Sequence, residues 1–169
     1  MTLSSRITRL PRAFEPDLGR EALRHTPWAS GDIADLINGA GGSSPYLNGL
    51  IRREGAWLEE ALDAPEAAFD TICAMLPTEE DPAVALRHAK RRVALLTALT
   101  DLSGVWSLEQ VTGQLTRFAD LAVARALRFE VGREIARGKL PGATEADLDQ
   151  AGGMVVLAMG KMGAGELNY

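Results

Sequence analysis

The sequence predicts a mainly α-helical protein whose C-terminal end carries the first strand and glycine turn of a truncated α/β domain. Apolar residues recur at helical spacing through two long stretches between residues 83 and 136. A run of six apolar residues, 154–159, is then followed by three glycines within six positions. We therefore divide the chain into a helical region, 1–142, and the start of an incomplete second domain, 143–169.

The composition is that of a water-soluble globular protein. Of the 169 residues, 46% are apolar and 24% are charged, and the net charge is −5. An acidic total argues against general nucleic-acid binding, which draws its affinity from a basic surface. No apolar run approaches the roughly 20 residues that span a bilayer, and no apolar stretch of signal-peptide length follows the N-terminal arginines. We expect a cytoplasmic protein that binds neither nucleic acid nor membrane.

Cysteine and histidine usage excludes several kinds of site. Cys73 is the only cysteine, so neither an internal disulfide nor a thiolate metal cluster can form, and its apolar helical surroundings predict a buried structural thiol. The two histidines, His25 and His88, lie far apart in the sequence. Their separation argues against a histidine metal site and against a Ser-His-Asp triad.

The first 76 residues predict short helices separated by proline and glycine. Three prolines break residues 1–30 and leave room for one helix at 18–25. The glycine-rich stretch 39–45 predicts a loop, after which Ser44 and Pro45 are suited to the N-cap and first position of a helix. Gly55 is expected to interrupt that helix. Another helix is predicted at 65–76, ended by Pro77.

The next 60 residues predict a helical hairpin. The acidic stretch 78–82 favours a helix start, and apolar residues at helical spacing extend this helix to Leu102. Gly104 marks its end, and Ser107 with Gln110 forms a capping-box pattern at the start of the second helix. That helix should continue to about residue 136, before Gly138. Trp106 is expected to close the end of the hairpin.

After residue 142 the pattern changes. Thr144 can cap a short helix ending near Gln150, and residues 154–159 then favour a buried strand because valines and flanking glycines surround a short apolar run. A single strand leaves its backbone groups without partners. We therefore expect strand partners from outside the helical region.

The glycine turn after this segment suggests polyphosphate binding. Gly160, Gly163 and Gly165 allow the backbone to approach a ligand closely, and Lys161 supplies a mobile positive charge. The spacing is not that of a Walker A loop, because position 155 is valine and no Ser or Thr follows the lysine. It also departs from the G-x-G-x-x-G order of dinucleotide-binding folds.

The segment Leu157-Ala-Met-Gly-Lys-Met-Gly-Ala-Gly-Glu-Leu-Asn168 resembles the signature of the glutamine synthetase adenylyltransferase family, within the polymerase β-like nucleotidyltransferases. Three upstream segments are also similar to that family: the Ser-Pro-Tyr-Leu segment at 43–47, the arginine-rich helix at 86–92, and the helix break and restart at 101–112. The resemblance covers most of residues 40–169, and its C-terminal motif is the specific part.

This resemblance implies a bifunctional enzyme that adds AMP to glutamine synthetase and removes it, and so regulates nitrogen assimilation. It implies Mg²⁺, with ATP, ADP and phosphate as substrates, and glutamine synthetase and the PII signalling protein as partners. The implied nucleotide-binding residues are Gly160, Lys161, Gly163, Gly165 and Glu166. The family's metal-binding aspartates follow the glycine turn in a Ser-Asp-Ile-Asp-Leu segment that is absent before Tyr169. We expect an inactive piece of the half that removes AMP, with no catalytic residue of its own.

Several alternatives stay open at this point. Lys161 could contact a ligand or be solvated, and Glu166 could orient the turn or lie free at the surface. The cluster Arg87–Arg92 could be a solvated face, or it could face phosphates or an acidic partner. The whole chain could also be a free-standing helical interaction module, or belong to another polymerase β-like transferase such as an antibiotic-modifying enzyme.

Overall fold

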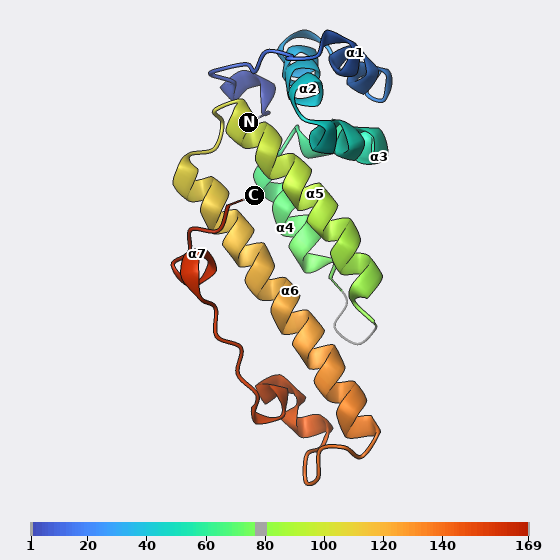
Figure 1. Ribbon diagram of the computed structural model, residues 1–169, viewed down its shortest axis with the longest axis vertical. Helices are drawn as coiled ribbons and strands as arrows, with labels where there is room; N and C mark the ends of the chain where they lie inside the picture. Colours follow the sequence, from blue (N-terminus) through green and yellow to red (C-terminus); the bar gives the residue numbers. More distant parts are fainter. Residues whose placement is uncertain (1, 77–80, 169) are drawn as a thin grey trace.

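The structure is a computed structural model that describes residues 2–76 and 81–168, and every regular element within these ranges is a helix (Figure 1). The longest elements are α5 and α6, which lie side by side, with α1–α3 gathered at one end of α5. The mainly helical fold class is therefore confirmed. In chain order the elements are η1 (Ser4–Arg6), α1 (Pro16–Arg24), α2 (Gly31–Ser43), α3 (Pro45–Ala61), α4 (Pro65–Ala74), α5 (Ala83–Leu102), α6 (Leu108–Ala136), η2 (Glu145–Gly153) and α7 (Gly160–Gly163).

The predicted helical hairpin is confirmed, together with the residues that form its turn. Gly104 ends α5 with a φ of +69°, a conformation that favours glycine. The Ser107 hydroxyl accepts a hydrogen bond from the Gln110 amide at 3.3 Å, and the Gln110 side chain accepts one from the Ser107 amide at 2.9 Å. Trp106 is buried beside this turn and donates its indole N–H to Glu66 on α4 at 2.8 Å. The turn is thus fixed by local capping and by a tertiary contact.

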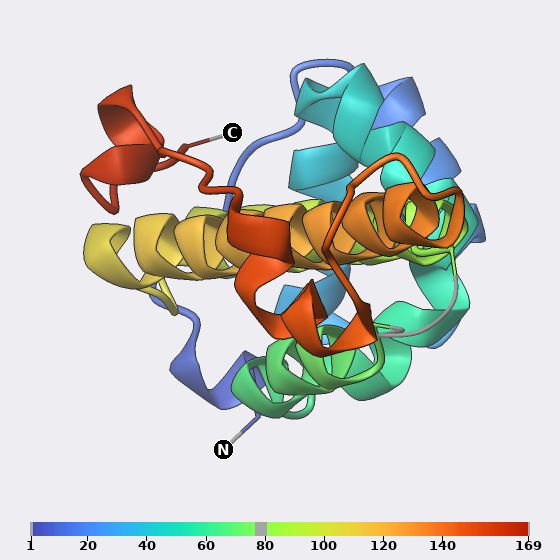
Figure 2. The ribbon, with the colours of Figure 1, turned by 90° about the horizontal axis from the view of Figure 1, so that it is seen from below.

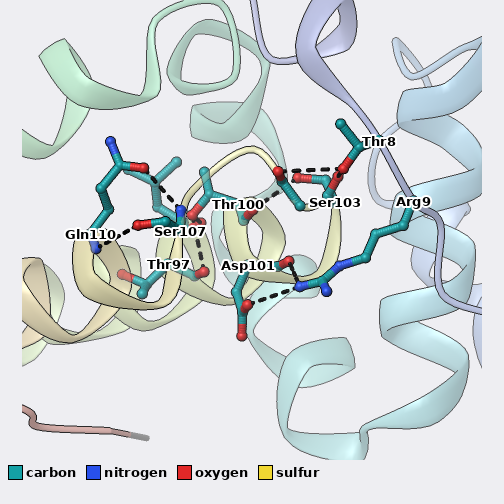
Figure 3. Close-up of polar contacts among 10 residues, drawn as sticks. Thr8, Arg9, Thr97, Thr100, Asp101, Ser103, Ser107 and Gln110 are labelled. Atoms are coloured by element: carbon teal, nitrogen blue, oxygen red, sulfur yellow. Dashed lines mark hydrogen bonds and ion pairs between the residues drawn. The ribbon is translucent and has the colours of Figure 1, made fainter.

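The N-terminal segment also contacts the turn between α5 and α6 (Figure 3). The amide of Thr8 donates to the carbonyl of Ser103 at 3.0 Å. Arg9 donates to both the carbonyl and the carboxylate of Asp101. Residues that are almost 100 positions apart in sequence therefore meet at the end of α5.

The core lies where α2, α3 and α4 pack on α5. Its fully buried members are aliphatic or aromatic side chains from different helices: Leu36, Ile51, Leu58, Phe69, Leu96 and Leu99. Burial of such side chains is the main favourable term in folding. Cys73 is buried at the edge of this cluster, as the sequence predicts for a structural thiol.

The predicted loop at 39–45 is wrong up to residue 43, because α2 continues through these glycines to Ser43. A Cβ on Gly39 would lie 2.0 Å from the Pro11 carbonyl oxygen. A Cβ on Gly42 would lie 2.5 Å from the Cβ of Ala13. The glycines are needed for close contact with the N-terminal segment, which the helical propensity of glycine does not reveal.

The remaining predictions for the first half have mixed outcomes. The Ser44 hydroxyl caps α3 as predicted, accepting from the Leu47 amide at 3.2 Å. The predicted interruption at Gly55 is wrong, since α3 is continuous; a Cβ there would lie 2.3 Å from the His25 carbonyl oxygen. The predicted helix at 65–76 is confirmed as α4. Pro77 and residues 78–80 lie outside the described residues.

The predicted strand at 154–159 is wrong. In the described part of the chain this segment is irregular and exposed, and it runs back along α6 from η2 to α7 (Figures 1 and 2). Leu157 is 80% exposed and Met159 is 84% exposed. The physical reason is that its neighbours are helical, so no adjacent strand takes up its backbone hydrogen bonds. The helix predicted at Thr144 exists as the 3-10 helix η2, capped by Thr144 and Asp147.

Candidate functional site

The predicted glycine turn is a compact, exposed loop built around α7. Gly160, the first residue of α7, and Gly165, which follows the helix, adopt φ values of +61° and +74°, a conformation that favours glycine. The turn closes on itself through hydrogen bonds from the amides of Ala164, Gly165 and Glu166 to carbonyls of residues 160–162, at 2.8–3.1 Å. Its conformation is therefore set locally.

The turn leaves backbone donors open. The amides of Lys161 and Met162 lie in the first turn of α7, where an α-helix provides no carbonyl of its own to pair them. Successive unpaired amides of this kind can surround an anion. The Lys161 and Glu166 side chains are exposed beside them. The structure thus brings the five predicted residues into one turn, while the role of each stays a prediction.

An apolar groove of about 840 Å³ lies next to this turn, between α2, α3, α5, α6 and the end of the chain. Its lining includes Tyr46, Leu47, Val93, Phe118 and Leu167. Most of its lining atoms are apolar, and its volume is in the range of small-molecule sites. The sequence analysis missed it, because a groove depends on how helices are placed.

One hydrogen bond connects the glycine turn to the groove. The Leu167 amide donates to the Thr116 hydroxyl on α6 at 3.2 Å. That hydroxyl in turn donates to the Thr112 carbonyl at 2.9 Å. Leu167, which follows the turn, is therefore fixed against the first third of α6, with its side chain at the groove.

The cationic cluster 87–92 is arranged around one buried carboxylate. Glu54 on α3, 6% exposed, accepts from the Nε of Arg91 at 3.0 Å and from the Nε of Arg92 at 2.9 Å, one arginine on each oxygen. Arg92 also lies over the Trp57 ring, with its guanidinium carbon 5.0 Å from the ring centroid. Arg91 makes a 2.7 Å contact with the His88 Nδ1.

Sequence reasoning identified these arginines but not their partner. Glu54 occupies an otherwise apolar stripe of α3 with Leu47, Ile51 and Leu58, at steps of four, three and four residues. An acid at such a core-facing position needs a positive partner, because an unpaired buried charge is costly. This spacing was the available signal for Glu54.

The residues that the structure describes do not by themselves fit a magnesium site. Mg²⁺ prefers several carboxylate or phosphate oxygens. No group of three or more His, Cys, Asp or Glu side chains is placed to hold a metal ion within residues 2–76 and 81–168. In the glycine turn, Glu166 is the one carboxylate.

Within the described part of the chain, no helix is both long enough and apolar enough to cross a membrane.

Comparison with known proteins places the chain among relatives of nucleotidyltransferases. Residues 34–169 match the family model described as glutamate-ammonia ligase adenylyltransferase. This match runs from α2 to the end of the glycine turn. The chain belongs to that family.

Three curated relatives carry the same description. The bifunctional glutamine synthetase adenylyltransferase/adenylyl-removing enzyme of Caulobacter vibrioides is 37% identical over 182 residues, covering 99% of this chain and 18% of the relative. The proteins of the same description from Rhodopseudomonas palustris and a Bradyrhizobium species are 36% and 40% identical, covering 99% and 92% of this chain and 19% and 16% of theirs. The chain thus spans less than a fifth of the length of these relatives. No solved structure matches it.

Proposed function

We propose that this chain acts, as part of a longer protein, in the transfer of AMP to glutamine synthetase and in its removal, and so in the regulation of nitrogen assimilation. The observation that carries the proposal is the family match over residues 34–169, which includes the glycine turn. Because the chain spans 18% of the Caulobacter relative, the activity is proposed for the longer protein.

In this proposal the glycine turn holds nucleotide phosphates. The amides of Lys161 and Met162, in the first turn of α7, would donate to phosphate oxygens, and Lys161 would add a positive charge beside them. Gly160, Gly163 and Gly165 would keep side chains out of the way, and Glu166 would orient the turn. ATP, ADP and phosphate are the proposed ligands.

Magnesium and catalysis are assigned to carboxylates outside the 169 residues. Bound Mg²⁺ would offset the charge of the phosphates during transfer. No Asp-x-Asp follows the glycine turn in this sequence. We therefore expect the 169-residue chain alone to transfer no AMP. Glutamine synthetase and the PII protein are the proposed partners of the longer protein.

A chimera tests this function. Residues 1–169 would replace the aligned segment of the Caulobacter vibrioides enzyme, and AMP transfer to and from purified glutamine synthetase would be measured with labelled nucleotide. We expect both activities to persist. The Lys161→Ala and Gly163→Val changes in the chimera should each lower transfer about tenfold or more, because they remove a phosphate contact or obstruct the backbone approach.

The matched control is Lys139→Ala, another exposed lysine of the C-terminal region, which should leave transfer unchanged. A chimera that folds and assembles normally yet neither adds nor removes AMP would overturn the proposal for this chain. Full activity of the Lys161→Ala and Gly163→Val chimeras would overturn the role of the turn.

A further inference from the structure

We propose that Arg91 and Arg92, held by Glu54 and bordered by Arg87 and Lys90, form a binding site for a phosphate group on the exposed side of α5. This site is separate from the glycine turn and does not depend on the proposed function.

The two arginines are held in place before any ligand arrives. Each uses its Nε to bind one oxygen of the buried Glu54 carboxylate, at 3.0 and 2.9 Å. Arg92 is further fixed by the Trp57 ring beneath it. A guanidinium group that is already ordered loses little conformational entropy on binding, so each hydrogen bond to a ligand is worth more.

Binding through Nε leaves terminal donors for a ligand. The two terminal nitrogens of Arg92 donate no hydrogen bond within the described part of the chain, and Arg91 uses one of its own on His88. The side chains of Arg91 and Arg92 are 28% and 37% exposed, so these groups reach solvent. Planar guanidinium forks match the oxygens of a phosphate group.

The charge of the cluster favours an anion. Two guanidinium groups share one carboxylate, which leaves an excess of one positive charge on a chain whose total is −5. Arg87 lies four residues before Arg91 on the same face of α5 and is exposed. Lys90, next to Arg91 in the sequence, is exposed as well. No described carboxylate forms an ion pair with either of them. Ordinary solvated lysines and arginines differ from this pair, which is half-buried and fixed.

The location of Lys90 connects this cluster with the apolar groove. Lys90 is the one charged residue of the groove lining, and Leu167 lies in the same lining. A free phosphate or pyrophosphate would occupy the arginines alone. A nucleotide would place its phosphates on the arginines and its base in the groove. Phosphate is the shared chemistry, and the two sources can be separated by experiment.

The test uses the 169-residue chain without magnesium, titrated with pyrophosphate and, in a second arm, with ATP. The readout is the NMR signals of the Arg92 Nε–H and the Trp57 indole N–H, compared with sodium chloride at equal ionic strength. We expect saturable shifts with pyrophosphate and not with chloride. Arg92→Met and Arg91→Met should each weaken binding about tenfold or more, because each removes charge-assisted hydrogen bonds.

Arg137→Met is the matched control, since Arg137 is an exposed arginine paired with Glu134 at the far end of α6. It should bind pyrophosphate like the unchanged chain. Should the Arg91 or Arg92 variant fail to fold by circular dichroism, Arg87→Met with Lys90→Met on the exposed face replaces it, with an expected weakening of about threefold or more. ATP binding more tightly than pyrophosphate would identify a nucleotide as the source.

Unchanged pyrophosphate affinity in the folded Arg92→Met variant would overturn the site. So would equal shifts with chloride. Loss of binding in Lys161→Gln together with unchanged binding in Arg92→Met would move the phosphate to the glycine turn, which would overturn this inference and support the proposed function. Loss of binding in Arg92→Met together with unchanged binding in Lys161→Gln would support this inference. The role of the glycine turn would then be decided by the chimera experiment.

Discussion

The helical body, up to Ala136, and the C-terminal segment, 137–168, differ in how far their large apolar side chains are buried. In the body, large aliphatic side chains from different helices cover each other, and Leu96 and Leu99 are fully buried. In the C-terminal segment Val155, Leu157 and Met159 are exposed, although they belong to a run of six apolar residues. An apolar run therefore forms a strand only where a neighbouring strand pairs its backbone, and it is buried only where another element covers it.

Glycines also have different roles in the two regions. In α2 they allow close contact, as at Gly39 against Pro11. In the C-terminal segment they allow positive φ with open space around them, as at Gly160 and Gly165. One residue type thus serves packing in the body and backbone conformation in the glycine turn.

The largest expected effect is on stability, when a leucine side chain is truncated in the helical body and, for comparison, in the C-terminal segment. Leu99→Ala should lower the free energy of unfolding by about 2–5 kcal/mol, because it leaves a cavity in the core. Leu157→Ala should change it by less than about 0.5 kcal/mol, since that side chain is already in water. Urea denaturation followed by circular dichroism measures both. A loss at Leu157 equal to that at Leu99 would show that the segment packs in solution.

A smaller effect is expected from Gly39→Ala. The new Cβ would lie 2.0 Å from the Pro11 carbonyl oxygen, so the N-terminal segment must move, at about 1–3 kcal/mol. Gly113→Ala is the matched change, in a helix with nothing within 4 Å, and it should raise stability by about 1 kcal/mol. Thermal unfolding compares the two. Stabilisation by both changes would mean that α2 glycines matter for propensity alone.

The smallest effect concerns pH. Hydrogen bonds from Arg6, and secondarily from Trp106, lower the pKa of Glu66 from its usual 4.5 to about 2. A carboxyl group whose pKa is lower in the folded state stabilises the protein at pH values above its pKa in the unfolded state. This stabilisation is lost as the pH falls toward the folded-state pKa. Glu66→Gln should therefore cost about 1 kcal/mol or less near neutral pH, because the side chain is nearly half-exposed.

The difference between Glu66→Gln and the unchanged protein should shrink between pH 4.5 and about 2. Urea midpoints across this range measure it. The comparison carboxylate in the C-terminal half is Glu134, whose lowered pKa comes chiefly from its hydrogen bond with Lys139. Glu134→Gln should leave the urea midpoint nearly unchanged. A pH-independent cost at Glu66 would contradict the ion pair with Arg6.

The helices with strong local signals were predictable from sequence. The capping pattern at Ser107 and Gln110 and the stop at Gly104 appear in the structure as predicted, because caps depend on neighbours in sequence. The end of α2 was not predictable in this way. Its glycines weaken the helical signal, and the contact that makes them useful involves Pro11, almost 30 residues earlier.

The candidate sites divide in the same manner. The glycine turn was predictable because its residues are consecutive and its hydrogen bonds are local. The arginine cluster was visible as a charged run, but its meaning depends on Glu54, 37 residues earlier than Arg91. The apolar groove had no sequence signal, since five separate parts of the chain form it.

The sequence by itself determined the family, the two long helices and the position of the glycine turn, because periodicity, capping and motif wording act over a few residues. Only the tertiary structure decided that 154–159 is exposed and irregular, that the α2 glycines pack, and that Glu54 holds two arginines. Those features depend on which distant segments meet, and such contacts are set by the packing of the whole chain rather than by local preference.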